Sequence, residues 1–474
     1  MSLVTECKEG SFEFQGVGGR EVVAQFDGGQ ITSDGGALLL GELESKRQII
    51  KQFAACFVDH RNPELIEHTV EELIKQRVYG LVLGYEDLND HDQLRSDSLL
   101  ATIVGKKDPT GKNRRRSSDR GKAMAGKSTL NRLELRTDDP KLDAAYKKIS
   151  VNADEIDRFF VDAFLQEYEE APETIILDLD ATDDRIHGNQ EGRFYHGYYG
   201  DYCYLPLYIF CGDSLLCARL RKSDADQSAG SVDEVSRIVG QIRKRWPKVR
   251  ITLRADSGFC RDEIMTWCES NSVDYVFGFA KNKRLLALIE KQMEQAKLQY
   301  EITGKASRVF SDFYYRTLDS WDRKRRVVAK AEHLEKGSNP RFIVTSLGWW
   351  EADARPLYEQ TYCGRGEMEN RIKEQQLELF ADRTSTSRMK SNQLRLWFSS
   401  VAYVVMNEMR RLALPGTKME QAQCGTIRLK LLKIGAQVVV SVRRIVARLS
   451  SSYPYQELFE RAYRALTALP VLCC

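Results

Sequence analysis

The chain has 474 residues, of which 42% are hydrophobic and 29% charged, so it is long enough for several domains and is not an intrinsically disordered chain. Its 71 lysines and arginines nearly balance 68 aspartates and glutamates, so the net charge by itself does not indicate a nucleic-acid partner. The 11 cysteines form no CxxC pair and no stretch of 18 apolar residues occurs. We therefore expect a cytoplasmic protein with reduced thiols and no membrane span.

The N-terminal part predicts short strands broken by glycine, then a turn and N-cap at residues 33–36 before a first helix, and a second helix that begins at Pro63. Residues 105–127 are the most basic stretch of the chain, with nine lysines and arginines against two aspartates. Such a run is either an exposed tail or a segment that contacts phosphates, and we favour the second reading. The candidate DNA-contacting residues here are Arg114, Arg115, Arg116, Lys122 and Lys127.

The same stretch contains a match to the phosphate-binding P-loop pattern GxxxxGK[ST], from Gly121 to Ser128. A true P-loop follows a buried apolar strand, so that backbone N–H groups at the start of a helix surround the phosphates. Here the preceding residues are Arg-Arg-Arg-Ser-Ser-Asp-Arg, which do not suit a core strand. We therefore do not predict nucleotide binding.

Residues 174–182 read Thr-Ile-Ile-Leu-Asp-Leu-Asp-Ala-Thr, an apolar strand that runs into two aspartates. Because side chains alternate between the two faces of a strand, Asp178 and Asp180 point to the same face. Burying an unpaired carboxylate is costly, and a divalent cation, which prefers oxygen ligands, would offset that cost. The alternative is a solvated strand end or a helix N-cap.

The next hundred residues predict an α/β layer with a mixed sheet. Apolar strands are expected at 204–210, 214–220, 249–255 and 274–279, and helices at the segments beginning with Ser231 and Glu263. The strand ending at Ala255 runs directly into Asp256. Because ligands gather at the carboxyl ends of strands in such sheets, Asp180 and Asp256 are candidates to share a cation.

Two further segments follow the α/β layer. Residues 307–347 predict β-strands and carry a basic cluster at 323–326. After them, Tyr362, Arg365 and Glu369 recur at positions i, i+3 and i+7, which places them on one helical face that Lys373 continues. The alternative to a functional face is a solvated amphipathic helix with an Arg–Glu pair.

Together these motifs resemble the DDE transposases of bacterial insertion sequences: Asp180 in Asp-Ala-Thr, Asp256 in Ala-Asp-Ser-Gly-Phe, and Glu369 in Tyr-x2-Arg-x3-Glu. The resemblance covers about residues 170–410. It is to the branch that has a ribonuclease-H-like catalytic domain with a β-stranded insertion between the second and third acids. One position departs from that branch, which often has a lysine seven residues after the glutamate where this chain has Gln376. Lys373, one turn earlier, is the candidate to replace it.

The resemblance implies that Asp180, Asp256 and Glu369 hold Mg²⁺, with Mn²⁺ as a substitute and two ions per active site. Asp178 is the second choice for the first acid, because the family's first acid lies two residues before a threonine, as Asp180 lies before Thr182. The other residues implied to contact DNA are Tyr362, Arg365 and Lys373 on the phosphates, Arg325 in the basic cluster, and Trp321 as a candidate to stack on an extruded base.

The expected fold is a ribonuclease-H-like mixed-sheet catalytic domain with an inserted β-rich subdomain and a mainly helical N-terminal DNA-binding region. The expected division is 1–168 for the N-terminal region, 169–300 with 351–412 for the catalytic domain, 301–350 for the insertion, and 413–474 for a basic and apolar C-terminal region. The cations of this last region suit a packing arm, a second DNA contact, or both.

The predicted activity is metal-dependent cleavage and strand transfer at the ends of an insertion sequence. The partners would be double-stranded DNA, as element ends and as target, and a second copy of the chain. The alternatives are a nuclease without strand transfer, an inactive DNA-binding descendant and a P-loop ATPase. Two basic regions and a β-stranded insertion favour the transposase, because a dedicated nuclease does not need them.

Overall fold

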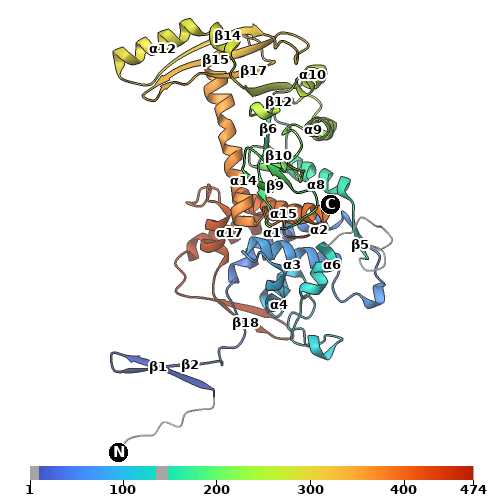
Figure 1. The fold of residues 1–474 in the computed structure, drawn as a ribbon. Coiled ribbons are helices and arrows are strands. Elements are labelled where there is room, and N and C mark those ends of the chain that lie inside the picture. Colours follow the sequence, from blue (N-terminus) through green and yellow to red (C-terminus); the bar gives the residue numbers. More distant parts are fainter. Residues whose placement is uncertain (1–9, 135–147, 473–474) are drawn as a thin grey trace, which may run out of the picture. The chain divides into compact units, whose positions relative to one another are not determined.

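The computed structural model describes residues 10–134 and 148–472, and its elements are labelled in Figure 1. The chain forms two compact units, which are described separately below. The first comprises residues 1–54, 61–133 and 408–474, and the second comprises residues 55–60 and 134–407. The N-terminal and C-terminal parts of the chain therefore belong to one unit. No helix of the described residues is long and apolar enough to cross a membrane.

The second unit is built on a nine-stranded mixed sheet. Its strand order is β11-β10-β6-β12-β13-β17-β15-β14, and β16 pairs with β15 off this path. The strand bounds are β6 Thr174–Ala181, β10 Leu207–Cys211, β11 Ser214–Arg219, β12 Arg250–Ala255, β13 Asp274–Phe279, β14 Ser307–Tyr315, β15 Arg325–Leu334, β16 Gly337–Ser338 and β17 Arg341–Thr345.

Five neighbouring strands of this sheet, from β11 to β13, have β6 at their centre. Across the sheet, these five strands are the third, second, first, fourth and fifth in the order of the sequence. β6 is antiparallel to β10, as β10 is to β11, whereas β12 is parallel to both β6 and β13. Apolar side chains fill both faces of the central strands, as expected for strands covered on both sides. The mixed α/β architecture predicted from the sequence is confirmed.

The strands of the predicted insertion extend this sheet and do not form a sheet of their own. β17 pairs antiparallel with β13, β15 pairs with β17, and β14 pairs with β15. The pairing of β17 covers the edge of β13, whose backbone N–H and C=O groups would otherwise be unpaired. Figure 1 shows these strands with helix α12 (Glu290–Thr303) beside β14 and β15.

The helices of this unit pack against the sheet. The remaining elements are α8 Ala153–Leu165, α9 Ser231–Arg245, α10 Asp262–Ser270, α11 Lys283–Leu288, α13 Ala354–Pro356, the π-helical turn η6 Leu357–Tyr362, α14 Gly366–Leu379 and α15 Met389–Ala413, with small strands β4 Phe57–Asp59, β5 Ile149–Val151, β7 Asp184–Arg185, β8 Phe194–His196 and β9 Asp201–Tyr204. α8, which the sequence placed in the N-terminal region, packs on β11 and α9, and its Val161 and Phe164 are part of the core of the sheet.

One predicted strand is divided in the structure. The apolar run 204–210 forms the end of β9 and most of β10, with a break at Leu205 and Pro206. Proline has no backbone N–H to give to the ladder, so a continuous strand cannot run through this position. The break separates the small sheet β7-β9-β8 from the central sheet.

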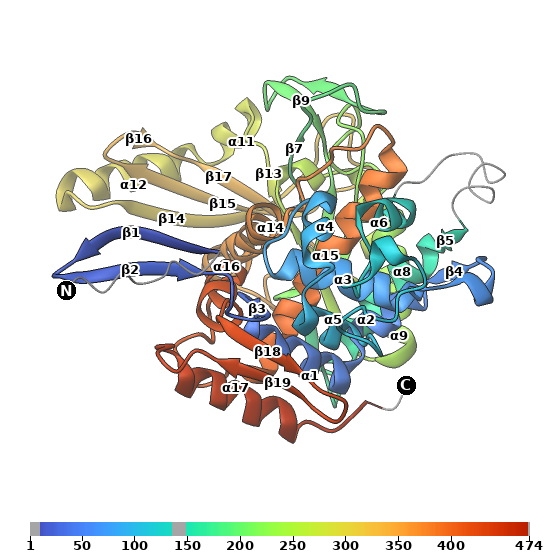
Figure 2. The ribbon, with the colours of Figure 1, turned by 90° about the horizontal axis from the view of Figure 1, so that it is seen from below.

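The first unit combines helices with two small β-structures. Its elements are β1 Ser11–Val17, β2 Arg20–Gln25, β3 Ile31–Thr32, α1 Leu38–Arg47, α2 Ile49–Ala54, α3 Val70–Val82, α4 His91–Leu94, α5 Ser98–Val104, α6 Lys127–Glu134, α16 Cys424–Ile427, β18 Ala436–Val440, β19 Ile445–Leu449 and α17 Gln456–Ala468. Figure 2 shows β3, β18 and β19, which form a three-stranded sheet. In α3, Thr69 and Glu72 form a capping box that satisfies the first N–H groups of the helix.

Candidate active site

The first two predicted acids lie level with each other at the same edge of the sheet. β6 and β12 are parallel neighbours, and Leu179 pairs with Ala255. The next residue of each chain segment is Asp180 or Asp256, so both carboxylates occur where the two strands end. Asp180 accepts a hydrogen bond from the N–H of Ala181 at 2.9 Å, and Asp256 accepts one from the N–H of Gly258 at 2.8 Å. Parallel pairing therefore brings together two acids that lie far apart in the sequence.

Glu369, on the first turn of α14, lines the same pocket as the two aspartates. The pocket has a volume of about 790 Å³. Its lining also contains Arg365 and Lys373 from the same helical segment, together with residues of the loop after β6 and of the β8–β9 hairpin. The three predicted acids, which come from three separate parts of the chain, thus line one hollow of the second unit.

Several carboxylates lie close together in this pocket, and their crowding affects the pKa of Asp180. Burial, assisted by the negative charges of Asp256 and Glu369, raises the pKa of Asp180 to about 7, and Arg365 opposes this rise. Arg365 Nη1 lies 2.9 Å from Glu369 Oε1. Burial alone would lower the pKa of Arg365, but the carboxylates of Asp180, Glu369 and Asp256 outweigh it and raise that pKa. Positive charge is therefore favoured here, whether from arginine or from a bound cation.

Asp178 is held by a buried arginine on the neighbouring strand. Arg254 Nε and Nη2 donate to the two carboxylate oxygens of Asp178 at 2.5 and 2.7 Å. Both side chains are almost fully buried, with exposed fractions of 8% for Arg254 and 3% for Asp178. This two-pronged pair uses both oxygens of Asp178, which is a second argument for Asp180 as the first acid.

The same arginine contacts the segment that leads into α14. Arg254 Nη1 donates to the carbonyl oxygen of Thr361 at 2.6 Å. Thr361 belongs to the π-helical turn η6, and such turns leave backbone carbonyls that need partners. A Cβ atom at Gly364 would lie 2.6 Å from Arg254 Nη1, so only glycine fits there without a shift. The guanidinium thus ties β6, β12 and the start of the Tyr-x2-Arg-x3-Glu segment together.

This segment is helical but not a regular α-helix. Tyr362 ends the π-helical turn, residues 363–365 form a 3-10 turn, and α14 begins at Gly366. The predicted single α-helical face is therefore replaced by three kinds of helical turn in sequence. Leu357 and Tyr358 anchor the π-helical turn on Val276, Val328 and Ile343 of the sheet, which fixes where the motif starts.

Tyr362 lies against the backbone next to Asp256. A Cβ atom at Gly278 would be 2.6 Å from the Tyr362 hydroxyl and 2.8 Å from the backbone nitrogen of Ser257. Glycine at this position allows the tyrosine to approach the end of β12. Burial raises the pKa of Tyr362, and the charge of Asp256 adds to the effect against the opposing influence of Arg365.

Lys373 and Gln376 both line the pocket. The amide nitrogen of Gln376 donates to Asp184 Oδ1 at 2.8 Å and to the carbonyl of Asp183 at 3.2 Å. Burial raises the pKa of Asp184 to about 8, and the hydrogen bond from Gln376 opposes this rise. Gln376 therefore supports the loop after β6. Lys373, by contrast, is an exposed residue of the pocket lining.

Sequence reasoning missed one part of the pocket lining, which comes from the hairpin of β8 and β9. His196, Tyr198 and Tyr199 line the pocket together with the acids. Tyr198 is 85% exposed, and its ring packs edge-on with that of Tyr199, with 5.1 Å between centroids. The dense run of aromatic residues from Phe194 to Tyr202 was the available signal, but a run of tyrosines alone does not show which site it faces.

A family model described as "Transposase DDE domain group 1" matches residues 14–471. The chain belongs to the DDE transposases. The match spans nearly the whole sequence and confirms the family inferred from the three acids and the Tyr-x2-Arg-x3-Glu motif. A comparison with curated proteins found no match. Membership implies polynucleotidyl transfer or nuclease chemistry, DNA as a partner and, as is general in the family, divalent metal ions.

In this transposase the predicted stacking residue is buried. Trp321 has an exposed fraction of only 3% and packs against Phe279 at 4.8 Å and Tyr315 at 6.0 Å between ring centroids. A ring enclosed in this way has no free face for a base, so we no longer include Trp321 among the candidate DNA contacts.

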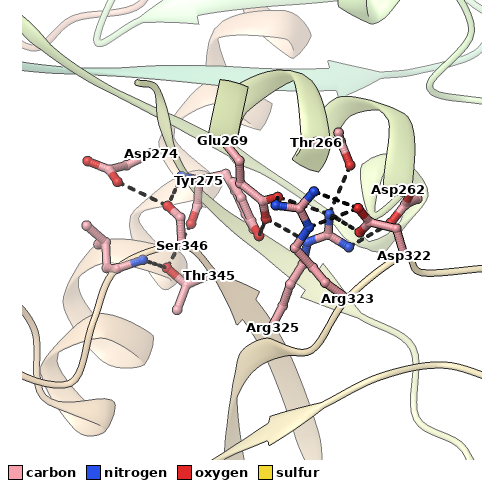
Figure 3. Close-up of polar contacts among 11 residues, drawn as sticks. Asp262, Thr266, Glu269, Asp274, Tyr275, Asp322, Arg323, Arg325, Thr345 and Ser346 are labelled. Atoms are coloured by element: carbon pink, nitrogen blue, oxygen red, sulfur yellow. Dashed lines mark hydrogen bonds and ion pairs between the residues drawn. The ribbon is translucent and has the colours of Figure 1, made fainter. Parts of the chain in front are cut away.

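Arg325 is likewise an interior residue of the transposase. Figure 3 shows its guanidinium among the acids of α10 and of the loop before β15, with Asp262 Oδ1 at 2.6 Å, Glu269 Oε1 at 2.7 Å and Asp322 Oδ1 at 3.1 Å. Because three carboxylates already surround it, Arg325 holds β15 to α10, and we do not assign it to DNA.

The basic segment of the first unit divides into structural and exposed cations. Arg114 contacts Glu67 at 3.0 Å and His68 at 2.6 Å, and Lys122 donates to the carbonyl of Ser118 at 2.8 Å. Arg115 and Arg116 are exposed. Within the Arg-Arg-Arg run, the side chains available to a partner are therefore the second and third arginines.

The P-loop match of the transposase has no P-loop structure. In the described chain, the residues before Gly121 form a loop with a 3-10 turn at Ser117–Asp119 and no strand. Lys127 Nζ lies 3.1 Å from the side-chain oxygen of Asn89 and 3.6 Å from Asp92 Oδ2. The lysine therefore stabilises the start of α6 through neighbouring side chains.

Proposed function

We propose that this transposase binds the terminal inverted repeats of its insertion sequence and catalyses cleavage and strand transfer with Asp180, Asp256 and Glu369. The observation that carries the proposal is the shared pocket: three acids from distant segments line it beside two cations, Arg365 and Lys373. The strand order of the central sheet, with β6 in the middle and the acids at its carboxyl edge, supports a ribonuclease-H-like catalytic domain.

The donor set fits a hard divalent cation. Carboxylate oxygens are the ligands that Mg²⁺ prefers, and the raised pKa of Asp180 reflects a site where negative charge is crowded and a cation is favoured. We propose that Asp180, Asp256 and Glu369 hold Mg²⁺, or Mn²⁺ as a substitute, with two ions per site. Bound ions would lower the charge barrier for displacement at phosphorus.

The protein's own residues position the DNA. Arg365 suits a phosphate oxygen, because its guanidinium can leave Glu369 and pair with an anion in the same place. Lys373, exposed at the pocket, adds a second positive charge, and Tyr362 fixes the backbone near Asp256. In the first step the oxygen of water attacks phosphorus and the 3′-oxygen leaves. In the second step the oxygen of the freed 3′-hydroxyl attacks a phosphorus of target DNA, and the 3′-oxygen of the target strand leaves as a hydroxyl.

The test of the proposal is cleavage of a labelled duplex that carries the element's own end. We expect nicking at the end in Mg²⁺ or Mn²⁺ and none in EDTA, followed by joined products when target DNA is present. Nicking without joined products would favour a ribonuclease-H-like nuclease. Tight binding without cleavage in any metal would favour an inactive DNA-binding descendant.

We also propose that Tyr198 replaces Trp321 as the aromatic surface for DNA bases near the cut. Its ring is free on one side and is held by Tyr199 on the other. Stacking of a base on an aromatic side chain contributes about 1–3 kcal/mol. Tyr198→Ala should therefore raise the KM for the end about 5- to 150-fold, and Tyr198→Phe should change it little.

The matched control is Tyr195→Ala, on the same hairpin. Tyr195 is 60% exposed but is not part of the pocket lining. Steady-state cleavage with varied end concentration measures KM for the three variants. Equal KM values for Tyr198→Ala and Tyr195→Ala would remove Tyr198 from the DNA site.

Because two DNA ends have to be joined, we propose that the active complex contains two copies of the chain and both element ends.

A further inference from the structure

The C-terminal β-ribbon, defined here as β18, β19 and the turn that joins them (residues 436–449), carries exposed cations at its tip. Two cations that precede it are used internally: Arg428 Nε donates to the carbonyl of Val82 at 2.6 Å, and Lys433 Nζ lies 2.6 Å from the buried Asp34. Arg443 and Arg444, by contrast, are exposed. The two cations before the ribbon therefore stabilise the unit, whereas the two arginines at the tip can contact a partner molecule.

The base of the ribbon is anchored and its tip is not. β3 pairs with Ala436 and Gln437, and the N–H of Val438 donates to the carbonyl of Gln30 at 2.8 Å. Beyond this point β19 is the one strand of the described residues that pairs with β18, as far as the pair Val440 and Ile445.

The tip itself is a tight turn. The N–H of Ser441 donates to the carbonyl of Arg444 at 2.9 Å, and the N–H of Arg444 donates to Ser441 Oγ at 3.1 Å. Val442 and Arg443 therefore form the apex, where Val442 is completely exposed. These contacts hold the two arginines in a defined turn.

The charged residues of the chain segment that contains the ribbon are all of one sign. No aspartate or glutamate occurs between Glu420 and Glu457, although acids and bases nearly balance over the whole chain. An acid-free segment with exposed arginines is complementary to a polyanion such as DNA. The outward face adds a small apolar strip, since Val439 and Val446 pair across the ribbon and are about two-fifths exposed.

We propose that the C-terminal β-ribbon is a duplex-DNA contact separate from the active site, in which Arg443 and Arg444 bind phosphates and Val442, the residue before them at the apex, faces the duplex. Proteins that bind the minor groove combine cationic side chains with apolar ones at the groove. The contact is independent of sequence, so its role is to add affinity and to hold DNA in place.

The experiment measures binding of a labelled duplex carrying the element's end to the full chain in EDTA, as a function of salt concentration. Each phosphate contact contributes about 0.9 to the slope of log affinity against log salt. Arg443→Ala/Arg444→Ala should therefore make the slope shallower by about 2 and weaken binding at low salt at least about tenfold. Arg443→Lys/Arg444→Lys should keep most of the slope, which separates loss of charge from loss of folding.

The matched control is Arg461→Ala/Arg464→Ala on α17, which removes the same charge from exposed positions of the same unit. This control should leave the slope within a few tenths of the wild-type value. If the tip variant binds with the wild-type slope and affinity, the proposal is wrong. It is also wrong if the variant loses self-association without DNA while its salt slope stays unchanged, because the ribbon would then be a contact between copies.

The two proposals fail in different ways. Binding is measured without cleavage, so an inactive pocket does not affect the result. A wild-type chain that binds ends with a steep slope but never cuts them would overturn the active-site proposal and leave the ribbon intact. A wild-type chain that binds no duplex would overturn both.

Discussion

We expect Asp180→Asn and Asp256→Asn each to lower the rate of end cleavage at least about a thousandfold, a loss of about 4 kcal/mol of transition-state stabilisation. Each substitution removes a carboxylate from the pocket while keeping the size of the side chain. Asp178→Asn should have a much smaller effect on the chemical step, because Asp178 is occupied by Arg254. Single-turnover cleavage of a labelled end measures all three. A greater loss for Asp178→Asn than for Asp180→Asn would move the first acid to Asp178.

The thermal stability of the metal-free protein should also depend on Asp180. The pKa of Asp180 is raised to about 7, above its usual value near 4, so folding favours the protonated carboxyl. Its stabilising contribution is therefore complete below about pH 4 and is lost as the pH rises through about 7. Asp180→Asn, which stays neutral, should have a higher Tm than the wild type at pH 8 in EDTA.

Binding of Mg²⁺ should reverse this order of the two Tm values. Mg²⁺ binds the folded wild-type protein and raises its Tm by mass action, and it should raise the Tm of Asp180→Asn much less. Thermal unfolding at pH 8 with and without Mg²⁺ measures both effects and requires no activity. Equal metal-induced shifts in the two proteins would exclude Asp180 as a ligand.

The second large effect concerns stability and the placement of the Tyr-x2-Arg-x3-Glu segment. Arg254→Met leaves the buried carboxylate of Asp178 without its partner and Thr361 without its hydrogen bond, and should lower the free energy of unfolding by about 3–5 kcal/mol. Urea unfolding measures this loss. The double variant Arg254→Met/Asp178→Leu should recover much of it, because an apolar pair replaces an isolated buried charge.

Activity should not recover with stability in that double variant. Arg254 holds Thr361, four residues before Arg365, and no apolar side chain can replace that bond to the carbonyl. We expect kcat to stay low while KM changes less, since the misplacement affects the reacting geometry. Full recovery of both stability and kcat would show that Arg254 has no positioning role.

Several parts of the fold could be predicted from local sequence patterns. The strand at 274–279 was predicted with its observed bounds, and β12 and α9 within a residue or so, because alternating or 3.6-residue periodicity is carried by the segment itself. The same applies to the acids at the ends of β6 and β12. The break at Pro206 was missed because the apolar run continues through it.

The role of each charged residue was harder to predict. Arg325 and Arg443 both belong to basic clusters in the sequence, yet the first lies among three carboxylates and the second is exposed. The acids that surround Arg325 include Asp262 and Glu269 of α10, more than fifty residues earlier. A basic run therefore indicates charge, but not whether that charge is available to DNA.

The sequence by itself determined the family of this protein, the order of its strands and helices, and the three acids that are candidates for catalysis, because these depend on short motifs and local periodicity. Tertiary structure decided the rest. It paired Asp178 with Arg254, joined the insertion strands to the central sheet through β13, and placed the aromatic β8–β9 hairpin at the acids. The physical reason is that a buried charge or a strand edge is satisfied by whatever the fold brings next to it, and those partners come from distant parts of the chain.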